Sequence, residues 1–165
     1  MIMRGHAWKL GDGITTDHIA PGRYFHLRTN LPEYAKYCLG DIRPDFVKGA
    51  RRGDMIVAGQ NFGLGSSREH APILLKLNGI GAILAKSVAR IFFRNAINSG
   101  LPVLIVDTDR IREGDEIELD LDLGSVRNLT HGEVMSAPSL PPVMQAIIKD
   151  GGLVEHIKKH GRLQL

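Results

Sequence analysis

Three short, mostly apolar runs, separated by two segments of helical character, constrain the fold of this chain most strongly. The runs cover residues 54–59, 82–86 and 102–106, and each begins at a proline or directly after a glycine. Short runs that are apolar throughout are typical of strands buried on both faces of a parallel sheet. Parallel strands need crossover connections, and the intervening segments supply them as helices, one with apolar residues from Ile73 to Ile80 and one at residues 87–99. The middle of the chain therefore predicts an α/β fold.

Further elements are expected on both sides of this core: strands at residues 3–8 and 115–122, and short helices at about 32–39, 142–149 and 153–159. The second of these strands alternates polar and apolar side chains, as a half-exposed strand does. Residues 14–30 are polar and show no regular pattern. A length of 165 residues is close to that of one domain. We expect a single compact domain over residues 1–165, with a flexible loop at about residues 20–35.

Charge and cysteine content exclude several classes of function. The 21 basic and 18 acidic residues give a net charge of +3 without a polycationic tail, which argues against nucleic-acid or membrane partners. Cys38 is the single cysteine, so the chain cannot form an internal disulfide or hold a cysteine-ligated metal cluster. No apolar run reaches the roughly 18 residues that span a bilayer. The first residues lack the apolar stretch of a signal peptide. We expect a soluble, cytoplasmic protein.

The glycine- and serine-rich segment from Gly63 to His70 gives the strongest signal for chemistry. It lies between an expected strand and an expected helix, where free backbone N–H groups and the positive end of the helix dipole favour a carboxylate or phosphate. Arg68 adds a planar fork that can hold a carboxylate at two points. The spacing matches neither a phosphate-binding Walker loop nor the dinucleotide or hydrolase motifs. A plain capped helix start, with Ser66 and Glu69 at capping-box spacing, is the alternative interpretation.

Other polar residues allow more than one interpretation. Asp17 and His18 stand together in a polar stretch and could be an orienting pair, half of a metal site, or turn residues. Arg28 could bind an acidic ligand or lie in solvent. The aromatics of residues 90–95 favour the core over a ligand-binding role. Cys38 is most simply a packing residue.

Three motifs follow one another along the chain: Thr15-Thr16-Asp17-His18-Ile19, then Gly65-Ser66-Ser67-Arg68-Glu69-His70-Ala71, then Ala85-Lys86-Ser87-Val88-Ala89-Arg90-Ile91-Phe92 followed by Arg94-Asn95. In this order they resemble the signatures of the swivelling C-terminal domain of the aconitase superfamily. The resemblance runs from about residue 5 to residue 160 and implies a swivelling β/β/α domain. The chain length resembles that of the branch in which this domain is a separate polypeptide, the small subunits of isopropylmalate isomerases and homoaconitases.

The resemblance implies a partner and a reaction. The chain would close over the active site of a large subunit that carries a [4Fe–4S] cluster, in a heterodimer or heterotetramer. The single cysteine agrees, because this chain cannot ligate the cluster itself. The reaction would dehydrate a small 2-hydroxy acid and rehydrate the product to its 3-hydroxy isomer. The first expected substrate is isopropylmalate, in leucine biosynthesis.

The same resemblance implies roles for individual residues. Ser66 would be the general base that removes the proton from the carbon next to a substrate carboxylate. A serine hydroxyl is a weak base at neutral pH, so its alkoxide needs strong positive potential nearby. Ser67 and Arg68 would hold the carboxylate and stabilise the charge that develops on it. Asp17 would orient a neighbouring group such as an arginine, with support from His18.

Arg28 bears on specificity. It lies in Leu27-Arg28-Thr29, which resembles the corresponding loop of homoaconitases. An isopropyl group needs an apolar contact, whereas a further carboxylate needs an arginine, since an unpaired carboxylate in a closed site is costly. Homocitrate or homoaconitate, or another malate derivative, is therefore the alternative substrate. Tyr24 and Phe25 supply apolar surface in favour of isopropylmalate.

Two other classes of function compete with this interpretation. A stand-alone carboxylate- or phosphate-binding enzyme using Ser66, His70 and Asp17 predicts activity from the isolated chain. An RNA-binding role needs a continuous basic face and a steep dependence on salt.

Overall fold

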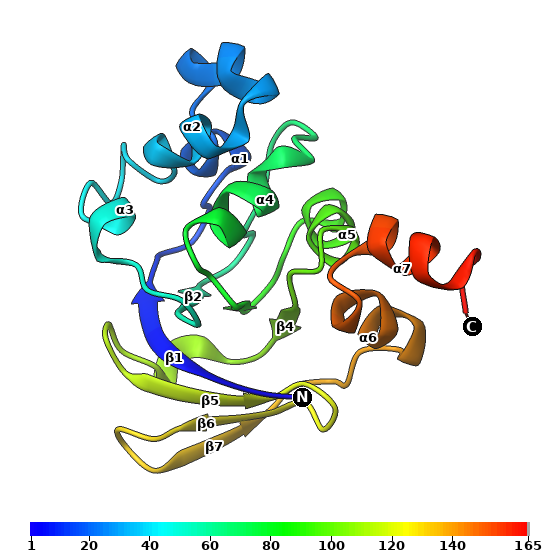
Figure 1. Cartoon of the computed structure of the whole chain (residues 1–165). Helices are drawn as coiled ribbons and strands as arrows, with labels where there is room; N and C mark the ends of the chain where they lie inside the picture. Colours follow the sequence, from blue (N-terminus) through cyan, green and yellow to red (C-terminus); the bar gives the residue numbers. More distant parts are fainter. Residues whose placement is uncertain (165) are drawn as a thin grey trace.

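One seven-stranded sheet, parallel in one half and antiparallel in the other, organises the computed structural model, which describes residues 1–164. The strand order is β4-β3-β2-β1-β5-β6-β7. The strands are β1 (Ile2–Lys9), β2 (Met55–Ala58), β3 (Ala82–Ala85), β4 (Val103–Ile105), β5 (Glu116–Asp120), β6 (Ser125–Asn128) and β7 (Glu133–Ser136). The first four are parallel and the last three form an antiparallel meander (Figure 1). The predicted α/β fold is confirmed.

Strand β1 joins the two halves of the sheet. Residues 2–6 pair with β5 in antiparallel fashion, and residues 7–9 pair with β2 in parallel. A Cβ atom on Gly5 would lie 1.9 Å from the carbonyl oxygen of Gly53. Glycine is therefore required where β1 passes from one neighbour to the other, because the backbones approach too closely for a side chain.

Every residue of β2 and β3 is buried, as the apolar runs predicted. Successive side chains of a strand point to opposite faces, so each strand contributes to two separate cores. One core contains Ile56, Ala58, Ile83 and Ala85, and the other contains Met55, Val57, Ala82 and Leu84. A sheet covered on both faces explains why these runs lack polar alternation.

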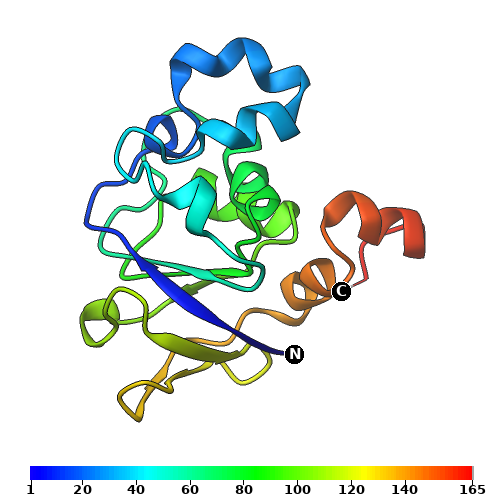
Figure 2. The same ribbon diagram turned by 60° about the vertical axis from the view of Figure 1, so that its left-hand side comes forward.

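The helices divide between the two faces. They are α1 (Thr16–Ile19), α2 (Leu31–Tyr34), α3 (Phe46–Gly49), α4 (His70–Leu77), α5 (Arg90–Asn98), α6 (Pro142–Lys149) and α7 (Leu153–His160). Helices α1 to α4 contribute to the first core, α6 to the second, and α5 to both. Figures 1 and 2 show α1 and α2 at the end of the molecule opposite the meander β5–β7. None of the helices within residues 1–164 is long and apolar enough to cross a membrane.

Residues 14–30, for which no regular structure was predicted, contain α1 and a 3₁₀ segment at Gly22–Thr29. Local polar contacts, rather than an apolar face, form α1. The Thr15 side chain accepts a hydrogen bond from the N–H of His18, and the His18 side chain accepts one from the N–H of Thr15. Such a reciprocal cap leaves no hydrophobic periodicity to detect. The helix expected at 32–39 is shorter, comprising α2 and a 3₁₀ turn at Ala35–Tyr37.

Two expected helix starts lie further along the chain. The alternative interpretation of a helix start capped by Ser66 and Glu69 is wrong, because α4 begins at His70 without a side-chain cap. Pro72 then falls in the first turn, where its missing N–H costs no helical hydrogen bond. Helix α5 begins at Arg90 rather than 87, because Val88 forms an isolated β-bridge with Phe62 and stays extended.

Candidate functional site

The loop that follows β2 is hydrogen-bonded to the start of α1. The N–H of Gly63 donates to the carbonyl of Ile14 at 2.7 Å, and the N–H of Thr16 donates to the carbonyl of Leu64 at 2.8 Å. The Thr16 hydroxyl donates to the carbonyl of Ser66 at 3.0 Å. These bonds place the first two sequence motifs side by side, although Thr16 and Ser66 are 50 residues apart.

The third motif packs against the same loop. Gly63 has a φ of +79°, and a Cβ atom there would lie 2.3 Å from Cγ of Phe92. Glycine is required because the backbone lies directly on that ring. A cavity of about 370 Å³ opens beside the loop. Its wall includes residues of all three motifs, among them Thr16, Gly65, Ser66, Arg68, Arg90, Ile91 and Asn95.

Arg68 is held by the first motif and remains 18% exposed. Its Nη1 lies 3.1 Å from Oδ1 of Asp17 and also donates to the carbonyl of Ala20. The same Oδ1 accepts the N–H of Gly22 at 2.9 Å, which fixes the carboxylate. Within residues 1–164, Nε and Nη2 of Arg68 have no hydrogen-bond partner. The guanidinium is therefore oriented at one nitrogen and still offers donors to a planar anion.

Ser66 and Ser67 are exposed at the mouth of this loop. In the described part of the chain their backbone N–H groups have no acceptor. Unsatisfied N–H groups beside an arginine form a concave, electropositive environment that suits a carboxylate. The arrangement can bind an anion and can stabilise negative charge on a nearby hydroxyl.

His18 lies apart from the arginine that Asp17 holds. Its Nδ1 accepts the N–H of Thr15 at 3.0 Å, so the ring caps α1. An acceptor role at Nδ1 leaves the proton of the neutral imidazole on Nε2. His18 contributes to the position of Asp17 through the start of the helix, and it has no hydrogen bond to Arg68.

Arg28 is exposed and stacks on an aromatic ring of its own segment. Its guanidinium lies 4.6 Å from the centre of the Phe25 ring, and Nη1 donates to the carbonyl of Phe25 at 3.3 Å. The Phe25 ring lies 5.9 Å from that of His70. Burial lowers the pKa of His70; Arg68 and Arg28 lower it further, and Glu69 opposes them. Arg28 and Arg68 thus act on one imidazole from separate segments.

Comparisons with known proteins identify the family of the chain. The chain is 59% identical over its full length to 3-isopropylmalate dehydratase small subunit 2 of Archaeoglobus fulgidus, and the match covers 100% of that protein. It is 55% identical to small subunit 1 of Thermotoga maritima, over 97% of each chain. The chain belongs to the family of 3-isopropylmalate dehydratase small subunits. A dehydratase is a hydro-lyase, so the family assignment makes the chain a subunit of an enzyme of this class.

Two further findings place this small subunit within a wider group. Residues 33–108 match the family model of the aconitase C-terminal domain. The crystal structure of 3-isopropylmalate dehydratase from Methanocaldococcus jannaschii superposes with a TM-score of 0.92 at 44% identity, covering 98% of this chain and 96% of that one. The expected fold family is therefore confirmed.

The small subunit does not offer the donor set of a cysteine-ligated iron–sulfur cluster. Such a cluster needs several thiolates, and this chain has one cysteine. Cys38 is fully buried in the first core, and burial raises the pKa of its thiol far above the usual range. A protonated, inaccessible thiol is a packing group rather than a ligand.

Three site residues were not identified individually from the sequence. Thr16 holds the loop through its hydroxyl, and Arg90 and Asn95 line the cavity. The only available signal was their place within the three motifs. A larger cavity of about 640 Å³ lies between α4, α5 and α7 and shares Asn95, but neither Ser66 nor Arg68 lines it. The smaller cavity is therefore the candidate site.

Proposed function

We propose that this chain is the small subunit of a two-subunit hydro-lyase that converts a 2-hydroxy acid into its 3-hydroxy isomer, with isopropylmalate as the first candidate substrate. One observation carries the proposal: Arg68, fixed by Asp17, keeps free donors beside the exposed hydroxyl of Ser66. The names of the relatives supply the substrate. The large subunit would supply the [4Fe–4S] cluster, and a cytoplasmic location is part of the same proposal.

In this proposal, Arg68 and Ser67 bind one carboxylate of the substrate. The planar guanidinium presents its free N–H groups to the two carboxylate oxygens, while the Ser67 hydroxyl and the free N–H groups of the loop add further donors. Asp17 keeps the guanidinium in one orientation, which reduces the entropy lost when the substrate binds. Because the donors already face the anion, little reorganisation accompanies the reaction.

Ser66 acts on the carbon next to that carboxylate. As the alkoxide, it takes the proton while the carbon–carbon double bond forms and hydroxide leaves the neighbouring carbon. Negative charge develops on the carboxylate during proton removal, and Arg68 stabilises it. In the hydration half of the reaction, Ser66 returns a proton to one carbon while a hydroxyl adds to the other. The same positive surroundings that bind the substrate favour the alkoxide of Ser66.

Homocitrate or homoaconitate is the second candidate substrate. Arg28 is exposed, is held against Phe25, and lies close enough to His70 to affect its pKa, as Arg68 does. A second carboxylate on the substrate could be paired by Arg28, whereas an isopropyl group could lie against Phe25. The 3₁₀ segment at Gly22–Thr29 thus offers both kinds of contact. Two predictions remain: that residues 20–35 move when the substrate binds, and that the whole domain closes over the large subunit.

An anaerobic assay of the complex tests the function. The chain is co-expressed with a candidate large subunit from the same genome, and ultraviolet absorbance follows the unsaturated intermediate with isopropylmalate and with homocitrate. We expect turnover from the complex and none from either subunit alone. Turnover of neither acid by a stable, cluster-loaded complex would reject both substrates. Activity of this chain alone would reject the two-subunit proposal in favour of a stand-alone enzyme.

A further inference from the structure

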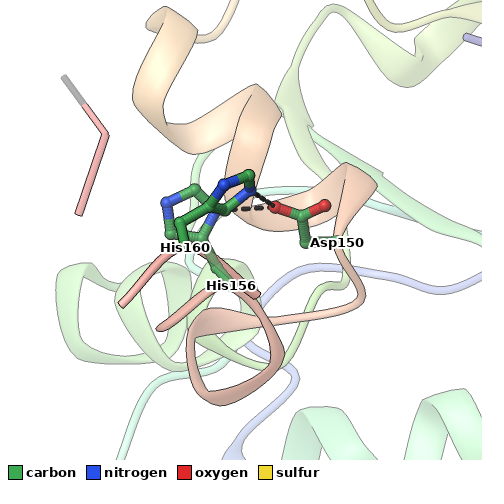
Figure 3. A group of neighbouring side chains, drawn as sticks. All are labelled: Asp150, His156 and His160. Atoms are coloured by element: carbon green, nitrogen blue, oxygen red, sulfur yellow. Dashed lines mark hydrogen bonds and ion pairs between the residues drawn. The ribbon is translucent and has the colours of Figure 1, made fainter. Parts of the chain in front are cut away.

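A carboxylate and two imidazoles converge in the C-terminal helical hairpin, away from the candidate site. Asp150 directly follows α6, and His156 and His160 lie one turn apart on α7 (Figure 3). Oδ2 of Asp150 lies 2.7 Å from Nδ1 of His156 and 2.9 Å from Nε2 of His160. Among residues 1–164, this is the one group of three potential metal ligands whose donor atoms all lie within 4.8 Å of one another.

The fold, rather than chance proximity on a surface, brings these three groups together. Gly151 and Gly152 have φ values of +92° and +136°, which turn the chain sharply between α6 and α7. A Cβ atom on Gly152 would lie 2.9 Å from the carbonyl of Asn98, so the turn is seated against the end of α5. The side chain of His156 is fully buried and that of Asp150 is 9% exposed. The donors are therefore preorganised and largely dehydrated.

We infer that Asp150, His156 and His160 form a binding site for a divalent transition-metal ion such as Zn²⁺. Zinc is commonly bound by two imidazoles that lie four residues apart on a helix, together with a carboxylate. Zinc bonds of about 2.0–2.1 Å place tetrahedral ligands about 3.4 Å apart. Oδ2 of Asp150 now lies 2.7 and 2.9 Å from the two imidazole nitrogens, so each distance must increase by less than about 1 Å for the ion to bind. His160 is 23% exposed, which leaves an open position for water.

Metal binding would exchange hydrogen bonds for coordinate bonds. His156 donates Nδ1–H to Asp150 while its Nε2 accepts the N–H of Gln164 at 3.3 Å. Coordination at Nδ1 releases that proton and places one on Nε2, so the contact with Gln164 is given up. Nζ of Lys159 lies 2.7 Å from Oδ1 of Asp150, which leaves Oδ2 for the ion. Lys159 is 65% exposed, so its ammonium can move into water when the ion binds.

Titration of the full chain with Co²⁺, which reports ligand geometry through its visible d–d absorption, tests the site. We expect one ion per chain, the spectrum of a four-coordinate site, and displacement by Zn²⁺. In His160→Ala, which alters the more exposed imidazole, affinity should fall at least about 100-fold, since loss of even an outer-shell partner costs about 10–100-fold. In Lys159→Ala, affinity should rise because a competing cation is removed.

His6→Ala is the matched control. His6 also lies near a carboxylate, with Nδ1 3.8 Å from Asp54, but within residues 1–164 it belongs to no group of three potential ligands. Its variant should therefore bind Co²⁺ as the unaltered chain does. Absence of stoichiometric binding, or a spectrum unchanged in His160→Ala, would overturn the inference and leave the three residues as a hydrogen-bonded clamp. Weaker or unchanged binding in Lys159→Ala would overturn the assignment of Asp150 as a ligand. Circular dichroism of each variant verifies folding.

Discussion

The Ser66–Arg68 loop and the α6–α7 hairpin both use an aspartate to hold basic side chains, but they differ in how completely the polar groups are paired. Asp17 is 64% exposed and holds Arg68 at one nitrogen. Asp150 is 9% exposed and contacts Lys159, His156 and His160 at once. The loop therefore has an excess of donors, whereas the hairpin has a carboxylate whose two oxygens are both in use.

This difference distinguishes the loop, where Arg68 keeps unpaired donors that suit an anion, from the hairpin, where the polar groups pair with one another. The unpaired donors of the loop contribute little to the stability of the fold, because water forms hydrogen bonds with them. They would contribute free energy only on binding a carboxylate. In the hairpin, removal of one side chain leaves buried polar groups without a hydrogen-bond partner, which lowers the stability of the fold. Substitutions in the loop should therefore affect turnover, and substitutions in the hairpin should affect stability.

The largest effect is expected from Ser66→Ala. If Ser66 is the base, turnover of the reconstituted complex should fall by about 10²–10⁴-fold, the usual contribution of general acid–base catalysis. Subunit assembly should be unchanged, since the Ser66 contact to Thr16 uses the backbone carbonyl. Steady-state kinetics and gel filtration measure the two properties. Ser136→Ala, on the exposed edge strand β7, is the control. Near-normal turnover in Ser66→Ala would remove Ser66 as the base.

A smaller loss is expected when the arginine fork is altered. Arg68→Lys should lower kcat/KM by about 10–100-fold, because charge-assisted hydrogen bonds contribute about 1.5–3 kcal/mol and lysine cannot bind in two-point fashion. Asp17→Asn should cost less, since the Ala20 carbonyl still holds Nη1. Arg127→Lys, exposed on β6 and outside the three motifs, should leave kcat/KM unchanged. A loss in Asp17→Asn that exceeds that in Arg68→Lys would contradict a purely orienting role for Asp17.

Arg28→Val should change the choice of substrate rather than the rate of the chemistry. We expect the ratio of kcat/KM for isopropylmalate to that for homocitrate to rise by about tenfold, since a charge-assisted contact on an exposed segment contributes about 1.5 kcal/mol, the low end of its range. Competition between the two acids in one reaction measures the ratio directly. An unchanged ratio would show that Arg28 does not contact the substrate.

The smallest effect is a pH dependence of stability that belongs to the hairpin. Lys159, His156 and His160 hold the pKa of Asp150 well below its ordinary value. A lowered folded-state pKa contributes stability above the unfolded value of about 3.9, and this contribution is lost as the pH falls below it. In EDTA, urea unfolding should show that the stability difference between the unaltered chain and Asp150→Asn shrinks as the pH falls from about 5 to about 3. A difference that grows at low pH would contradict this prediction.

Asp17→Asn should change the free energy of unfolding by only about 0–1 kcal/mol, as is usual for exposed ion pairs.

Local patterns determined much of the fold and part of the site. The buried strands, α5 and the α6–α7 hairpin could be predicted because their apolar residues recur at strand or helix spacing, with glycine or proline at the ends. The loop that we propose binds a carboxylate could also be located from its composition. The start of α4 could not, because the two residues at capping-box spacing do not bond each other and Pro72 is tolerated in a first turn.

The sequence by itself determined the α/β fold, the loop from Gly63 to His70 and the family resemblance, since each depends on residues close together along the chain. Only the tertiary structure decided that Asp17 meets Arg68, that Phe92 closes the loop at Gly63, and that Asp150 faces two histidines. The first two contacts join residues that lie far apart in sequence. The sequence positions of polar side chains show no periodicity that would identify their partners. The packing of the two cores determines which polar side chains come into contact.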